Sequence, residues 1–304
     1  MKGLEEREGE SRGTSARLLT VTPPFDLART TAPVWWARGR WPNVDWIDGV
    51  FIWVGWESDR SVWRSARQVD ASTLAISGPG DRDLDLEWTA SVLGTSAVMP
   101  TFDDPVLTLL ALQHRGLRPW SAGSLYDGVI SSIVGQSISV AAAATTERRL
   151  FELFSDGVNI NGRRFWPTPL PWQLASSTAA LVRGSGVTSK RAEALVAVGS
   201  LFATATETDS NRLSIRSDID AEELLAISGI GPWTVRSARL WGLGEADAHP
   251  TGDVALLRAA LRHYPEVLSL KDLDRKAERW KPNRGWAARL LWIDLLGFAD
   301  ADQG

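Results

Sequence analysis

The chain has 304 residues, 44% of them hydrophobic and 23% charged, which is the composition of a folded protein with two domains or one large one. It contains no cysteine, and this excludes disulfides, iron–sulfur clusters, thiolate zinc sites and a thiol nucleophile. The formal net charge of −4 argues mildly against nucleic acid as a partner, because phosphate binding usually requires clustered lysine and arginine. Because the sequence has no apolar run of about 20 residues and no apolar N-terminal signal, it predicts a cytoplasmic protein with no membrane partner.

Tryptophan is unusually frequent, with 16 residues against two tyrosines and two methionines. Indole rings stack on flat or cationic ligands, so this excess raises the expectation of an aromatic binding site. Most of the tryptophans in the first third of the chain are nevertheless expected to pack in and around a sheet.

The chain divides into three regions by composition and sequence pattern. Residues 1–17 are polar, charged and without period, and they predict a disordered tail. In residues 18–99, β-branched and aromatic segments such as Val50–Trp56 and Thr73–Gly78 alternate with clusters of Pro, Gly, Asn and Asp. This region predicts an N-terminal α/β domain, an antiparallel sheet with a helix on one face. Residues 100–304 are helical in pattern.

In residues 100–304, apolar residues recur at helical spacing in segments that begin and end at Gly, Pro, Ser or Asp. A sheet region followed by many short helices predicts an α+β fold. The predicted helical segments are 105–115, 125–154, 171–178, 189–205, 220–227, 232–243, 253–264, 271–280 and 285–298.

The sharpest local pattern is LLAISGIGPWTV at residues 224–235, which predicts a helix, a tight turn and a second helix beginning with proline. Gly229 and Gly231 allow the turn around an inward Ile230 and leave the amides of the second helix free. Such a helix start binds anions, and a nucleic-acid phosphate held by backbone amides answers the objection from net charge. A helical hairpin with no ligand is the alternative interpretation.

The spacing L-x-x-I-x-G-I-G-x-x-T is that of the helix-hairpin-helix motif. The run that follows it, through a loop to Asp253, resembles the helix-hairpin-helix DNA glycosylase superfamily. Residues 116–144 resemble the superfamily's segment that enters the flipped-base site, and residues 277–292 resemble the closing helix of its 3-methyladenine DNA glycosylase II (AlkA-like) branch. The similarity extends over residues 103–298 in the expected order. The resemblance implies an N-terminal antiparallel sheet domain followed by a mainly α-helical, two-lobed glycosylase domain. It also implies a monomer that acts on double-stranded DNA containing damaged bases, associated with the bacterial nucleoid.

The resemblance makes Asp253 the catalytic carboxylate. Asp253 follows Thr251 and Gly252 at a helix start, where the helix dipole favours a negative charge. Breaking an N-glycosidic bond develops positive charge on the sugar, which a carboxylate stabilises while it orients the attacking water. An ordinary first-turn helix acid would be the preferred interpretation of Asp253 without the family pattern around it.

Trp233 stands where the glycosylase/lyase members of the superfamily carry a lysine. The resemblance therefore implies a monofunctional enzyme that uses water and has no lyase activity. It also implies that Trp292 and Trp233 form the walls of the base pocket and that Tyr126 lies near its entrance, although each of the three also fits core packing. Trp286 is assigned to packing.

An aromatic face attracts a cation, and alkylation at purine N3 or N7 makes the base cationic. Together with this chemistry, the resemblance implies hydrolysis of the N-glycosidic bond of alkylated purines, 3-methyladenine and 7-methylguanine, in base-excision repair after base flipping.

Further DNA contacts are predicted at three places. In the hairpin they are Gly229, Gly231 and Thr234, and at a second helix start they are Lys190 and Arg191, which fit solvated helix-end charges equally well.

The third place is the segment IVGQSIS, with Gln136 and Ser137. Related proteins carry a larger Leu or Gln at the position of Ser137, which wedges into the gap left by the flipped nucleotide. Serine cannot fill that gap, so Gln136 or another loop would have to.

No cofactor is required, but the resemblance implies a structural Na+ or K+ bound by the backbone carbonyls of Leu225, Ile227 and Gly229. His249 fits a proton carrier or a loop-packing residue, and packing is preferred because no metal partner lies near it in sequence.

Two other functions stay open from sequence. One is a structure-specific DNA-binding protein without chemistry, which would have no need of Asp253. The other is a glycosylase for oxidised or deaminated purines.

Overall fold

The computed structural model describes residues 16–36, 39–57, 60–203 and 218–296. Of the predicted tail it describes only the last two residues, and Arg17 begins strand β1 (Arg17–Thr20) instead of ending a tail. Arg17 is fixed because its guanidinium forms an ion pair with the buried carboxylate of Asp85 and donates to the carbonyl oxygen of Gly80 at 2.9 Å.

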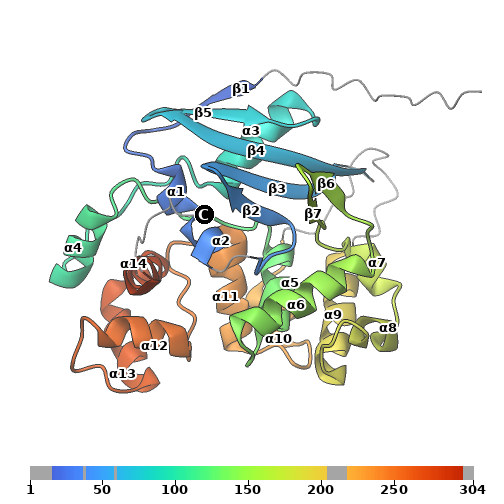
Figure 1. Ribbon diagram of the computed structural model, residues 1–304. Helices are drawn as coiled ribbons and strands as arrows, with labels where there is room; N and C mark the ends of the chain where they lie inside the picture. The colour runs from blue at the N-terminus through green and yellow to red at the C-terminus, as the bar shows by residue number, and fades with distance from the viewer. Residues whose placement is uncertain (1–15, 37–38, 58–59, 204–217, 297–304) are drawn as a thin grey trace, which may run out of the picture.

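Five antiparallel strands form the N-terminal sheet, in the order β1-β5-β4-β3-β2 (Figure 1). The inner faces of the central strands supply a core that includes Phe51, Trp53 and Ile76, and Trp53 stacks on Trp88 of helix α3 at 5.4 Å. The predicted antiparallel sheet with a packed helix is confirmed. Its other elements are β2 (Val44–Ile47), β3 (Val50–Glu57), β4 (Arg60–Asp70), β5 (Thr73–Ser77), α1 (Leu27–Thr30), α2 (Ala32–Trp36) and α3 (Arg82–Val92).

The remaining helices form two groups, both below the sheet in the view of Figure 1. The first group contains α4 (Pro105–Gln113), α12 (Val254–Leu261), α13 (Leu270–Ala277) with the short 3-10 helix Glu278–Trp280, and α14 (Arg284–Leu296). The second contains α5 (Leu125–Gly135), α6 (Val140–Glu152), α7 (Pro171–Ala175), α8 (Ala179–Arg183), α9 (Ser189–Phe202) and α10 (Ala221–Leu225).

Helix α11 (Pro232–Leu243) joins the two groups, because its Leu240 packs in the first core and its Val235 and Ala238 pack in the second. The predicted α+β, two-lobed arrangement is therefore confirmed. Among the described residues, no helix has the length and apolar character needed to cross a membrane.

Helices α5 and α11 approach closely because glycines meet at their crossing. A side chain on Gly128 would collide with the backbone of Ala238 and Gly242. This contact holds α11, and the turn that precedes it, against α5.

Two details differ from the sequence-based prediction. The segment 125–154 is not one helix, because α5 ends at Gly135 and α6 begins at Val140. The helical region also contains a β-hairpin, β6 (Val158–Ile160) and β7 (Arg163–Phe165). Its turn is Asn161-Gly162, with φ of 50° and 81°, the left-handed pair that a two-residue hairpin turn requires. Ile160 and Phe165 of this hairpin pack against the sheet.

Candidate functional site

Asp253 is the N-cap of α12, and both of its carboxylate oxygens accept a hydrogen bond. The backbone amide of Leu256 donates to Oδ1 at 2.8 Å, and the indole Nε1 of Trp233 donates to Oδ2 at 3.2 Å. On the same face of α11, the guanidinium of Arg236 donates to the hydroxyl of Thr251. The first turns of α11 thus hold the loop before α12 at two points.

The carboxylate of Asp253 keeps the capacity to act on a ligand. Asp253 is only partly buried, and each of its oxygens has a second acceptor position beyond the hydrogen bond described above. A fixed, partly exposed carboxylate of this kind can stabilise a nearby cationic centre and accept a proton from a water molecule.

The turn between α10 and α11 has the predicted form. Gly229 has a φ of 96°, a left-handed conformation that favours glycine, and Ile230 is buried with 7% exposure. Gly231 is the N-cap of α11 and supplies no side-chain cap, and Pro232 follows it. A Cβ atom on Gly231 would meet no atom within 4 Å, so the approach to this helix start is open.

The side chain of Gln136 is directed into this turn. Its Nε2 donates to the carbonyl oxygen of Gly229 at 3.0 Å and to Oγ1 of Thr234 at 2.9 Å. The expectation that Gln136 fills the gap left by a flipped nucleotide is therefore wrong for this conformation. The side chain of Thr234 is 2% exposed and pairs with Gln136, so a contact between Thr234 and DNA would have to come from its backbone amide in the first turn of α11.

The start of α9 lies against the same turn. The aliphatic stem of Lys190 packs beside Gly229, with Cγ 3.4 Å from the position that a Cβ there would take. The guanidinium of Arg191 donates to the backbone carbonyl oxygen of Gln136, and burial lowers the pKa of Arg191. Two segments predicted to contact phosphate are thus neighbours, together with the exposed Ser137.

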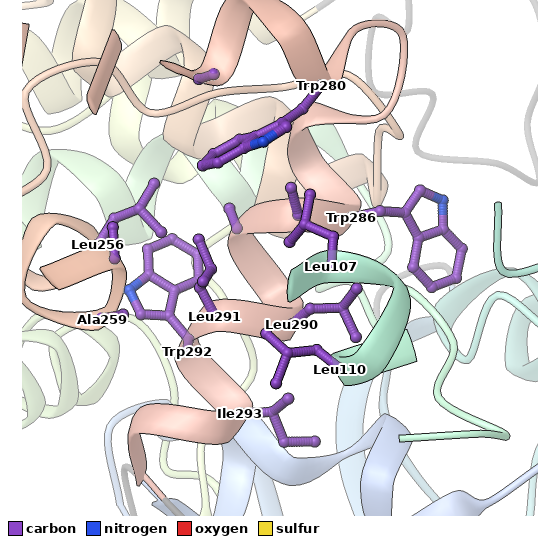
Figure 2. Packing of buried hydrophobic residues seen from close by; sticks show 14 of the residues in the cluster. Leu107, Leu110, Leu256, Ala259, Trp280, Trp286, Leu290, Leu291, Trp292 and Ile293 are labelled. Atoms are coloured by element: carbon purple, nitrogen blue, oxygen red, sulfur yellow. The ribbon is translucent and has the colours of Figure 1, made fainter. Parts of the chain in front are cut away.

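Trp292 lies apart from this cluster, inside the core of the first lobe. It is 8% exposed, and its ring stacks on that of Trp241 at 5.3 Å and 27°. Figure 2 shows it projecting from α14 toward Leu256 and Ala259 of α12. Trp286 is also buried in this core, as predicted.

A small cavity beside Trp292 has a buried guanidinium, that of Arg289, in its wall. Trp241 and Arg289 line it with Trp292, and neither Asp253 nor Trp233 is among its lining residues. Arg289 donates to the carbonyl oxygen of Leu240 at 2.6 Å and lies over the Trp241 ring at 4.7 Å. Burial lowers its pKa to about 9, so the guanidinium stays charged at neutral pH. Sequence reasoning missed Trp241 and Arg289, because no local pattern marks a contact between helices so far apart in the chain.

Tyr126 does not lie at the entrance to a pocket. It is 2% exposed, its ring packs on Phe202 at 5.2 Å, and its hydroxyl donates to the carbonyl oxygen of Pro169 at 2.8 Å. Burial raises its pKa well above the usual value. Tyr126 is a core residue of the second lobe, because position 126 falls on the inner face of α5.

The carbonyls expected to hold a monovalent cation have partners but are not saturated. The oxygen of Ile227 accepts from the amide of Ile230 at 3.0 Å, and that of Gly229 accepts from Gln136 at 3.0 Å. Each of these carbonyl oxygens keeps a second lone pair beyond the hydrogen bond it accepts. Leu225 ends α10 just before this turn. Among the described residues there is no cluster of His, Cys, Asp or Glu suited to a metal.

His249 is buried, with 4% exposure, and its Nε2 lies 2.9 Å from Oδ1 of Asp274. Burial lowers its pKa. Both observations fit the loop-packing interpretation.

No protein-family model matches the chain, but curated proteins and solved structures do. The chain is 27% identical over 199 residues to the DNA-3-methyladenine glycosylase of Bacillus subtilis, covering 62% of this chain and 63% of that protein. It is also 27% identical over 195 residues to DNA-3-methyladenine glycosylase 2 of Escherichia coli, covering 64% and 66%. The chain thus spans less than two thirds of the length of either relative.

Two solved structures show the same fold along most of the chain. The 3-methyladenine DNA glycosylase from Archaeoglobus fulgidus superposes with a TM-score of 0.70 at 20% identity, covering 92% of this chain and 98% of the other. The 8-oxoguanine glycosylase/lyase from Clostridium acetobutylicum superposes with a TM-score of 0.68 at 15% identity, covering 91% and 95%.

Proposed function

We infer that this chain, which belongs to the helix-hairpin-helix DNA glycosylase superfamily and to its 3-methyladenine DNA glycosylase II branch, is a DNA glycosylase of base-excision repair. The observation that carries this inference is the contact between Trp233 and Asp253. It ties the carboxylate to the first turn of the helix whose open N-terminus suits a DNA phosphate. A protein that only bound DNA would need the open helix start but not the fixed carboxylate.

In the proposed reaction the damaged nucleotide leaves the duplex and its N-glycosidic bond breaks. The electron pair of that bond goes to the base, and the sugar becomes an oxocarbenium-like cation. The Asp253 carboxylate stabilises this cation and accepts a proton from the water that attacks the anomeric carbon. Water is the nucleophile in this proposal, and the carboxylate rather than a cofactor activates it. Trp233 stands in the place of the lyase lysine, so we expect base release without strand cleavage.

The proposed substrates are purines alkylated at N3 or N7, in double-stranded DNA. The names of the two curated relatives support this choice.

A second candidate is a neutral oxidised or deaminated purine. Arg289 favours it, since a buried positive charge over Trp241 repels a cationic base brought to the neighbouring ring.

Mass spectrometry of bases released from methylated, deaminated and oxidised duplexes tests this proposal, with Asp253→Asn as the matched control. Asparagine also caps helices, so the variant should fold and bind DNA. We expect release by the native protein to be at least about a hundredfold faster, since an electrostatic contribution of this kind is worth roughly 3 kcal/mol or more. Full activity of Asp253→Asn would remove the catalytic assignment, and release of only neutral purines would favour the second candidate.

We also propose a monomer with a structural Na+ or K+ at the hairpin carbonyls. DNA affinity should then be higher in KCl or NaCl than in tetramethylammonium chloride at equal ionic strength, and equal affinity would argue against the cation.

A further inference from the structure

The loop that joins α5 and α6, residues 136–139, is attached to the hairpin at its first residue. Two hydrogen bonds, of 3.0 and 2.9 Å, hold the Gln136 carboxamide to Gly229 and Thr234, and Arg191 binds its backbone carbonyl. The loop therefore has a fixed place beside the turn that is proposed to hold a DNA phosphate.

The residues after Gln136 lie at the surface. Ser137 has a φ of 52° and is exposed, Ile138 is 37% exposed, and Val140 in the first turn of α6 is 58% exposed. Neither aliphatic side chain is part of the four hydrophobic clusters found among the described residues. Single exposed aliphatic residues are common on protein surfaces. Ile138, however, is on a loop that is held beside a helix start suited to an anion.

An enzyme that extrudes a nucleotide leaves a gap in the base stack, and proteins that unstack DNA fill such gaps with apolar side chains. At this loop Ser137 is too short and polar to do so, and Gln136 is held by the hairpin. Val140 is already fixed in a helix. The remaining apolar side chain on the loop itself is Ile138.

We propose that Ile138 is the side chain that enters the duplex and fills the gap left by the flipped nucleotide. This inference rests on the proposed function, because only an enzyme that flips its substrate needs such a residue. It moves the contact by one residue from the position that the family pattern gives to Ser137.

Ile138→Ala tests the proposal, with Leu153→Ala as the matched control. Leu153 is 38% exposed and lies at the opposite end of α6 from the loop. The first measurement is the preference for a duplex with a tetrahydrofuran abasic site over an intact duplex, which needs no catalysis. The second is the single-turnover rate of base release.

For Ile138→Ala we expect the abasic preference and the release rate to fall about tenfold or more, the effect of losing roughly 1.4 kcal/mol of gap-filling contact. The melting temperature should be unchanged, and Ile138→Leu should restore both properties. Leu153→Ala should behave as the native protein. Equal behaviour of the two alanine variants would overturn the proposal, and so would a larger loss for Ser137→Ala.

The outcomes separate this proposal from the function on which it rests. If the native protein released no damaged base but Ile138→Ala lost the abasic preference, the glycosylase assignment would fail, while the insertion of Ile138 into a gap in the duplex would stand. If the native protein released bases and Ile138→Ala did so equally well with an unchanged abasic preference, only the role of Ile138 would fail.

Discussion

The indole of Trp233 donates a hydrogen bond to the carboxylate of Asp253 at 3.2 Å, linking the first turn of α11 to the N-cap of α12. Trp233 was expected to form a wall of the base pocket, and this contact does not exclude stacking, because the N–H group lies in the plane of the ring. We expect Trp233 also to act as a positioning residue that orients Asp253 through its N–H group.

Trp233→Phe keeps an aromatic ring and removes the N–H donor. A hydrogen bond to a charged group contributes about 1.5–3 kcal/mol, so we expect base release to slow about tenfold or more while the Kd for DNA stays within about twofold. Single-turnover kinetics and a binding titration measure the two quantities. Trp172→Phe is the control, because Trp172 is half exposed on α7. An unchanged rate for Trp233→Phe would return Trp233 to a stacking role.

Gly231→Val separates phosphate binding from folding. Gly231 has φ −115° and ψ 175°, which valine adopts readily, and a Cβ there meets no atom within 4 Å. The fold should therefore be unaffected, while the added side chain obstructs the helix start and weakens binding to damaged and intact duplexes alike, about tenfold or more. Melting temperature and Kd are the measurements.

Gly229→Ala is the comparison variant, because it should change stability where Gly231→Val does not. Gly229 has a φ of 96°, so alanine should lower the free energy of unfolding by roughly 1 kcal/mol or more through backbone strain. If Gly231→Val left binding to both duplexes unchanged, the hairpin would not be the DNA anchor.

The sequence predicted the hairpin well because its determinants are local. A left-handed glycine, an inward Ile230 and a proline at the first helical position act within a few residues of one another. The β-hairpin at 158–165 was missed although Asn161-Gly162 marks it, because its strands are short and are completed by packing on the distant sheet.

The site was predicted less completely, because its contacts join distant helices. Asp253 and Trp233 were both named, but their hydrogen bond depends on how α11 and α12 pack. Tyr126 was misplaced because the choice between core and pocket is made by the packing of α5 against α9, which position 126 does not reveal.

The carboxylate of Asp104 is expected to contribute to the stability of the first lobe in a pH-dependent way. As N-cap of α4 it accepts from the amides of Val106 and Leu107, and it also accepts from the Tyr264 hydroxyl at 2.8 Å. Burial by itself raises the pKa of Asp104, but the Tyr264 and amide hydrogen bonds and the charge of Lys276 together lower it below its usual 3.8. The ionised carboxylate therefore stabilises the fold above that pH, and the contribution is lost as pH falls through the lowered value.

We expect Asp104→Asn, which keeps the cap, to lower the free energy of unfolding by about 1 kcal/mol at pH 7. This difference should begin to shrink as pH falls below about 3.8, the usual value, and should reach zero only below the lowered pKa of the folded protein, where Asp104 is neutral in both states. Urea unfolding between pH 7 and pH 3 measures it, and the exposed neighbour Asp103→Asn is the control. A difference that does not change with pH would mean that the charge of Asp104 is not involved.

Trp292 lies in the core of the first lobe, so its replacement tests packing and recognition together. Removing the ring should cost about 3–5 kcal/mol of stability, which makes Trp292→Ala uninformative about the base. Trp292→Phe keeps an apolar ring and weakens attraction to a cation. If the ring recognises cationic bases, release of 7-methylguanine should fall more than release of hypoxanthine, by at most about thirtyfold.

Melting temperature and both release rates, measured on Trp292→Phe and on the control Trp286→Phe, decide the role of Trp292. Trp286 is buried in the same core and should change stability without changing the ratio of the two rates. Equal losses on both bases with an unchanged melting temperature would make Trp292 a general stacking surface. Equal losses with a lower melting temperature would make it a packing residue only. In either case selectivity for alkylated purines would have to come from residues other than Trp292, and the buried charge of Arg289 would favour neutral lesions.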